Sequence, residues 1–93
     1  MKNNKDKIYR VPITGDLDLH AFSPRDIKSV VVEYISECHR LGIRELKIIH
    51  GKGKSVQKNI VHNLLKKHSL VMSFQDAPSQ FGGWGATIVT LKD

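Results

Sequence analysis

The sequence predicts an α/β domain in which two helices cover one face of a mixed, four-stranded sheet. Three observations predict it. The length of 93 residues suits one domain, two segments have helical periodicity, and four short apolar segments have strand character. Their order along the chain is β-α-β-α-β-β. Right-handed β-α-β crossovers then place both helices on the same face, which gives a two-layer sandwich with one open sheet face.

The first strand is predicted at residues 16–20, within a domain that spans residues 16–93. Leu17 and Leu19 face one side of this strand, and Asp16, Asp18 and His20 face the other. Residues 1–15 are expected to form a flexible basic tail or a short extended arm. Their basic, polar start lacks the apolar segment of a signal peptide.

The first helix has the clearest boundaries. Ser23 suits the N-cap, Pro24 the first helical position and Asp26 the capping-box partner, and Gly42 ends the helix. One apolar stripe follows helical spacing. Its members are Ile27, Val30, Val31, Tyr34, Ile35, Cys38 and Leu41.

The second half of the chain repeats the pattern. A strand at 46–49 leads into a glycine-rich turn and a helix that Ser55 caps. Strands at 70–75 and 86–91 flank a loop at 76–85, and the last strand is rich in β-branched residues. The predicted core positions of the second helix and third strand are Val56, Ile60, Val61, Leu64, Leu65, Leu70, Met72 and Phe74.

The charge is concentrated in one segment. The chain carries +6 overall, but residues 40–68 hold eight lysines and arginines against one acid, Glu45, a net charge of +7. Such a segment attracts polyanions, although a solvated basic surface explains it equally well. A membrane surface is not the expected partner, because no helix carries bulky aromatics opposite a basic face. No apolar run approaches the ~20 residues that span a bilayer. The only cysteine, Cys38, excludes an internal disulfide, which suits a reducing compartment, so we expect a cytoplasmic protein. We also expect it to be a monomer.

Asp18 and His20 form the first candidate site, at the carboxyl end of the first strand. A spacing of two places both side chains on one side of the strand. An imidazole titrates near neutral pH and can act as general acid or base on a phosphodiester. Asp18 can orient it or hold a metal ion. The alternative is that both side chains only bond the backbone at the strand-to-helix turn.

The turn at residues 50–55, HGKGKS, forms the second candidate site. Its glycines permit close backbone approach, and the following helix N-terminus attracts phosphate. Its candidate phosphate-binding residues are Gly51, Lys52, Gly53, Lys54, Ser55 and, one turn along the helix, Lys58. A P-loop is excluded, because Ile48 stands where its first glycine belongs. The alternative is a plain β-α turn.

These two sites are expected to meet. The carboxyl ends of parallel strands lie on the same edge of a sheet, so Asp18, His20 and His50 can line one cleft with the glycine-rich turn. These three side chains are the candidate catalytic residues. These three side chains could ligate a metal, but no Cys/His spacing of a zinc site occurs.

The aromatic residues of the last loop can take two roles, and the other histidines have no predicted role in the site. Phe81 and Trp84, in the stretch FGGWG, can stack with unpaired bases or pack into the core. His39, His62 and His68 are expected on the surface.

Three separated stretches resemble the Smr (small MutS-related) nuclease domain. They are LDLH at 17–20, HGKG at 50–53 and GGWGAT at 82–87 followed by Val89 and Leu91, in the family's order and spacing. The tailed, stand-alone form is similar to small bacterial members. The chain departs from the family at Ala21 and Ser55, where many members have glycine, and at Lys58, where many have arginine, whose bidentate phosphate clamp lysine cannot reproduce.

The resemblance implies a fold like the C-terminal domain of translation initiation factor three. It also implies endonuclease activity on DNA or RNA, with Asp18 and His20 in the catalytic stretch and residues 51–53 meeting the substrate. Partners would then include ribosome or repair complexes. Mg²⁺ or Mn²⁺ is expected if DNA is cut, and no cofactor is required if RNA is. The alternatives are a non-catalytic DNA- or RNA-binding module and, third, an adaptor that docks a protein on the open sheet face.

Overall fold

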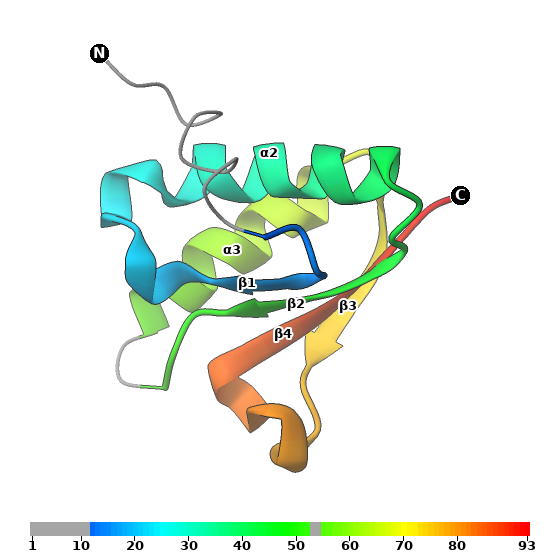
Figure 1. Cartoon of the computed structure of the whole chain (residues 1–93). Helices are drawn as coiled ribbons and strands as arrows, with labels where there is room; N and C mark the ends of the chain where they lie inside the picture. Colours follow the sequence, from blue (N-terminus) through cyan, green and yellow to red (C-terminus); the bar gives the residue numbers. More distant parts are fainter. Residues whose placement is uncertain (1–11, 53–54) are drawn as a thin grey trace.

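The computed structural model describes residues 12–52 and 55–93, and within them the predicted two-layer α/β fold is confirmed (Figure 1). The sheet has the order β1-β2-β4-β3. β1 and β2 are parallel, and β4 is antiparallel to both of its neighbours, so the sheet is mixed. The elements are β1 (Asp16–Asp18), α2 (Ile27–Arg40), β2 (Glu45–Ile49), α3 (Ser55–Lys67), β3 (Val71–Asp76) and β4 (Ala86–Leu91).

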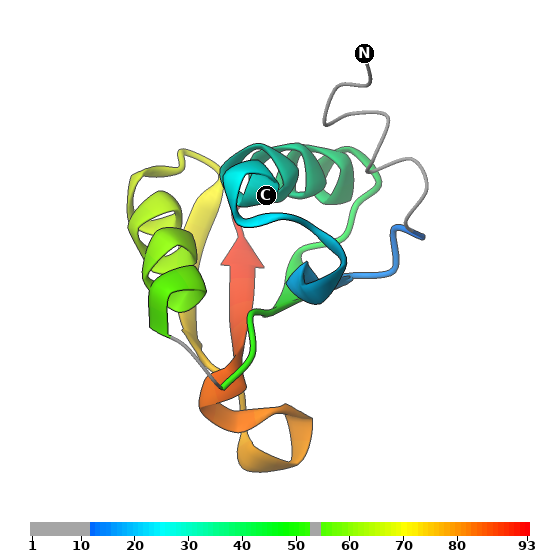
Figure 2. The same cartoon turned by 90° about the vertical axis from the view of Figure 1, so that its left-hand side faces the viewer.

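One apolar core lies between the sheet and the helices. Leu17, Ile48 and Val89 on the strands are fully buried in the same cluster as the apolar stripes of α2 and α3. The two helices also contact each other (Figure 2). Asp16 and Glu45 on the other sheet face are exposed. Within the described part of the chain, neither helix combines the length and apolar character needed to cross a bilayer.

β1 is two residues shorter than predicted. The carboxylate of Asp18 accepts a hydrogen bond from the backbone N–H of His20 at 2.9 Å, which starts a 3₁₀ turn at Leu19–Ala21. This is the capping behaviour of a short acidic side chain, and it bends the chain away from the strand path. His20 therefore lies on a turn at the edge of the sheet.

The start and end of α2 also differ from the prediction. Pro24–Asp26 form a 3₁₀ turn that leads into the helix, and the Ser23 hydroxyl faces the Asp26 carboxylate at 3.5 Å. The helix ends at Arg40, and Gly42 reverses the chain with φ +83°. Leu41 falls on this turn and is exposed, so its predicted core position is wrong.

A β-bulge in β3 overturns the predicted core position of Met72, whereas Leu70 and Phe74 pack against the core as predicted. Val71 pairs with Leu91 and Ser73 pairs with Thr90, which leaves Met72 as the extra residue. Met72 is therefore exposed, while Val71 is buried. Val56, in the first turn of α3, is exposed as well, contrary to its predicted core position.

Tyr34 ties α2 to the chain entering β1, and its hydroxyl is expected to be important for stability. The hydroxyl accepts a hydrogen bond from the Gly15 N–H at 3.0 Å and donates one to the Asp16 carbonyl at 3.1 Å. Tyr34→Phe leaves the buried Gly15 N–H and the part-buried Asp16 carbonyl without that partner, so the free energy of unfolding should fall by about 1–3 kcal/mol. Urea unfolding measures this.

The matched control for this prediction lies on the same helix. Val32 is exposed on α2, and Val32→Ala should change the free energy of unfolding by less than about 0.5 kcal/mol. Equal stability of Tyr34→Phe and the wild type would contradict the role given to the hydroxyl.

Candidate functional site

Asp18 and His20 form a close pair at the carboxyl end of β1. The Asp18 Oδ1 atom lies 2.7 Å from Nδ1 of His20, and both side chains are more than half exposed. The pKa of the Asp18 carboxyl is lowered, first by the backbone N–H of His20 and further by its imidazole. An ionised carboxylate only accepts hydrogen bonds, so Nδ1 of His20 carries the proton and donates it. The Nε2 atom of a neutral His20 then has a free lone pair.

The Nε2 atom of His20 lies against Gly51. A Cβ atom built on Gly51 would stand 2.9 Å from Nε2, and Gly51 has φ +89°, so both space and backbone conformation require glycine there. The pairing of β1 with β2 explains this contact, since Asp18 lies opposite Ile49 in parallel register. The structure thus brings together the two predicted sites, which are thirty residues apart.

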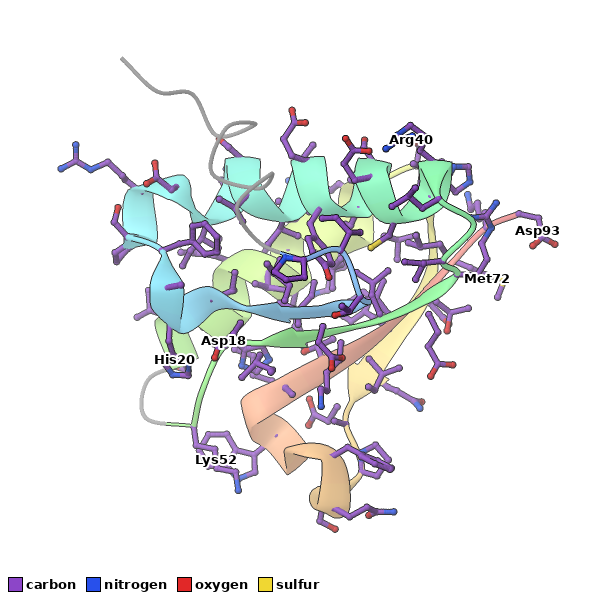
Figure 3. All side chains as sticks on the ribbon, in the orientation of Figure 1. Asp18, His20, Arg40, Lys52, Met72 and Asp93 are labelled. Atoms are coloured by element: carbon purple, nitrogen blue, oxygen red, sulfur yellow. The ribbon has the colours of Figure 1, made fainter. Side chains whose placement is uncertain are left out.

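The turn after β2 is fixed by the start of β4. The Gly85 carbonyl accepts hydrogen bonds from the N–H groups of His50 at 3.1 Å and of Gly51 at 2.8 Å. The stem of Lys52 runs over Gly85, where a Cβ atom would stand 2.7 Å from Cγ of the lysine. Asp18, His20 and Lys52 lie at the same end of the molecule, far from Met72 (Figure 3).

The remaining predicted phosphate-binding residues are placed differently. Ser55 is the exposed first residue of α3, and Gly53 and Lys54 lie outside the described residues. Lys58 forms an ion pair with Asp76 on β3, with 2.9 Å between Nζ and Oδ1. This pairing counts against phosphate binding by Lys58.

His50 is an interior residue with both ring nitrogens near polar partners. It is 3% exposed, its Nδ1 lies 3.3 Å from the Gly51 carbonyl oxygen, and its Nε2 lies 2.8 Å from Oγ1 of Thr87. A carbonyl only accepts, so Nδ1 carries the proton and Nε2 of the neutral ring accepts the Thr87 hydroxyl. This geometry favours holding the turn over direct contact with a substrate.

His62 completes the same chain of hydrogen bonds, contrary to its predicted surface position. Its Nε2 lies 2.9 Å from Oγ1 of Thr87, and its ring packs edge-on against Phe74. The Thr87 hydroxyl already donates to His50, so His62 donates its Nε2 proton to Thr87. Thr87 is fully buried on β4, and no role in the site was predicted for it.

One buried and two half-buried histidines predict a loss of stability on mild acidification. Burial, as the largest cause, lowers the pKa of His50, His62 and His68 below the ordinary value of 6.5. The unfolded chain therefore binds more protons than the folded one in this range, so stability is full above pH 6.5 and falls as the pH drops below it. The lowered pKa values of Asp18 and Asp76 add a loss only nearer 3.8.

Urea unfolding on either side of pH 6.5 measures this effect, and His62→Gln is its control. Glutamine keeps an N–H for Thr87 but does not titrate, so this variant should show a shallower pH dependence. A free energy of unfolding that stays constant or rises on acidification would contradict the burial of these rings in the neutral form.

The chain matches known proteins over nearly all of its length. The family model of the Smr domain matches residues 17–92. An endonuclease MutS2 from Caldicellulosiruptor saccharolyticus is 38% identical over 87 residues, which cover 94% of this chain but 11% of that protein. A ribosome rescue factor SmrB from Tolumonas auensis is 36% identical over 76 residues, which cover 82% of this chain and 44% of that protein. The chain thus spans only about a tenth of the MutS2 relative.

A solved structure agrees with the sequence matches. The crystal structure of the Smr domain of Thermus thermophilus MutS2 superposes with a TM-score of 0.81 at 30% identity. The aligned region covers 86% of this chain and all of that one.

Proposed function

This chain belongs to the Smr domain family, and on that premise we propose that it cleaves phosphodiester bonds in nucleic acid, with His20 as the acid–base residue. The observation that carries the proposal is the contact between Nε2 of His20 and Gly51. It brings an exposed imidazole, oriented by a carboxylate, to a backbone turn inside the basic segment of residues 40–68. An endonuclease and a ribosome rescue factor among the relatives agree with this chemistry.

On RNA, the chain's own residues suffice for the acid–base steps. Nε2 of His20 accepts the proton of a 2′-hydroxyl, whose oxygen attacks the adjacent phosphorus. The leaving 5′-oxygen then takes a proton, which the imidazolium can supply. Asp18 stabilises the imidazolium through the 2.7 Å bond to Nδ1. The products are a cyclic phosphate and a 5′-hydroxyl, so atoms and charges balance.

Lys52 and the turn supply positive charge for the phosphate. The lysine is exposed and directly follows Gly51, the residue that contacts the His20 imidazole. A cation placed where negative charge develops stabilises the transition state more than the ground state. His50 acts in this proposal as a positioning residue, because it holds the Gly51 carbonyl from the interior.

On DNA, water replaces the absent 2′-hydroxyl, and a divalent ion would help to ionise it. Within residues 12–52 and 55–93, no three histidine, cysteine or acidic side chains cluster as a metal site. We therefore assign no metal ligands, and the need for Mg²⁺ or Mn²⁺ stays a prediction.

Three further expectations also stay predictions. They are ribosome or repair complexes as partners, a cytoplasmic location and a monomeric state.

A two-substrate cleavage assay tests the proposal. Supercoiled plasmid and single-stranded RNA are each incubated with the protein, with Mg²⁺ or Mn²⁺ and with a chelator. We expect cleavage of at least one substrate, and RNA cleavage should persist in the chelator. Salt-dependent binding without cleavage would instead identify a binding module.

A further inference from the structure

We propose that Trp84 is a stacking platform for an unpaired base next to the scissile phosphate, so that the substrate is single-stranded or unpaired nucleic acid. Trp84 is 52% exposed on the 3₁₀ turn Gly83–Gly85. A domain of this size has few large apolar side chains for its core, and leaving an indole in solvent forgoes its burial energy. The exposure removes the alternative that Trp84 packs into the core.

The position of Trp84 links it to the cleft. Lys52 lies with its ammonium 6.0 Å from the centre of the indole ring. Its stem is held over Gly85, the residue after Trp84, and its backbone follows Gly51, which contacts His20. The imidazole, the cation and the indole are therefore linked through Gly51 and Gly85, by contacts among the turn after β1, the turn after β2 and the turn before β4.

This surface fits a nucleotide with its base exposed. A phosphate paired with Lys52 places a neighbouring base beside the indole, where an aromatic face stacks with any base. In a duplex both faces of each base are already stacked on their neighbours, so Trp84 discriminates against paired substrates. The neighbouring charge suits an anion, because residues 40–68 carry a net +7.

A second exposed aromatic side chain in the same loop provides the matched control. Phe81 is 56% exposed, similar to Trp84. It lines a hollow on the open sheet face that is bordered by the acids Asp16 and Glu45 and lies beside Lys47. Acidic side chains repel a nucleic-acid backbone, so Phe81 should contribute little to binding.

That the neighbouring phosphate is the one cleaved rests on the proposed function, but the test of base stacking does not depend on cleavage. Trp84 is the only tryptophan of the chain, so intrinsic fluorescence reports on this ring alone. The His20→Ala variant keeps the ligand intact. This variant is titrated with three ligands: a single-stranded oligonucleotide, the same strand in a full duplex, and the single strand with an abasic site at successive positions. Binding is measured in parallel by the anisotropy of a labelled ligand.

We expect the single strand to quench the tryptophan and the duplex to leave it unchanged. Trp84→Ala should weaken single-strand binding about 5- to 150-fold, while Trp84→Phe retains most of the affinity and Phe81→Ala all of it. Lys52→Ala should reduce the slope of log affinity against log salt by about one, whereas Trp84→Ala should leave that slope unchanged.

Each contrary result overturns the inference. The first is that no binding of the single strand is detected, and the second is binding of the single strand without quenching of the tryptophan. The third is that Trp84→Ala weakens the affinity for duplex and single strand equally. Selective quenching without any cleavage by the wild type would instead support the platform and reject the nuclease.

Discussion

His20→Ala is expected to lower the cleavage rate by about 10²- to 10⁴-fold, the contribution of a positioned acid–base group. The alanine removes the Nε2 lone pair beside Gly51 but leaves β1, β2 and the basic segment in place. Binding of nucleic acid should therefore change little. Single-turnover cleavage of the preferred substrate measures the effect. Equal trace cleavage by the wild type and the variant would reject the catalytic assignment.

Three further variants separate the chemistry of this pair from simple damage. Asp18→Asn keeps the shape of the side chain but loses the charge that stabilises an imidazolium, so it should slow cleavage by a smaller factor. In Asp18→Asn/His20→Ala the losses should not add, because the two residues act as a unit. His68→Gln, which changes a histidine beyond the end of α3, should leave cleavage unchanged.

Gly51→Ala is expected to abolish most of the activity by displacing His20. The new Cβ atom would stand 2.9 Å from Nε2, a distance at which the imidazole or the turn must shift. A displacement of about 1 Å can cost about 10²-fold in rate. The φ of +89° adds a backbone cost of about 1–2 kcal/mol in stability. Cleavage kinetics and urea unfolding measure the two effects.

Gly42→Ala separates the two costs. Gly42 has φ +83°, but the position of its Cβ has no atom within 4 Å among the described residues. The variant should therefore lose similar stability and keep full activity. If both glycine variants lose activity in proportion to stability, the contact with His20 is not the cause.

Much of the fold follows from periodicity, because burial imposes the helical and strand repeats on the sequence. The stripe of α2 and the whole of β4 lie where they were predicted, apart from Leu41. The errors fall where a local bond or an irregular pairing overrides the repeat. The Asp18 carboxylate ends β1 early, and the bulge in β3 turns Met72 away from the core.

The site was predictable as far as topology determines it. Parallel neighbours with their carboxyl ends on one edge bring His20 and the turn after β2 together, and only the backbone order is needed for that. The partners of His62 were not predictable. They depend on the position of Thr87 on β4 and on the register of β4 against β2 and β3, which no pattern within α3 reveals.

The position of β4 has a consequence for how the domain is made. Residues 86–91 are the last strand in chain order, yet they lie between β2 and β3 and pair with both. Synthesis runs from the N-terminus at about 5–20 residues per second. The edges of β2 and β3 that pair with β4 therefore stay unpaired until these residues emerge. Nascent chains arrested before residue 86 should accordingly be prone to aggregation, and completion of β4 should close the sheet in a single late event.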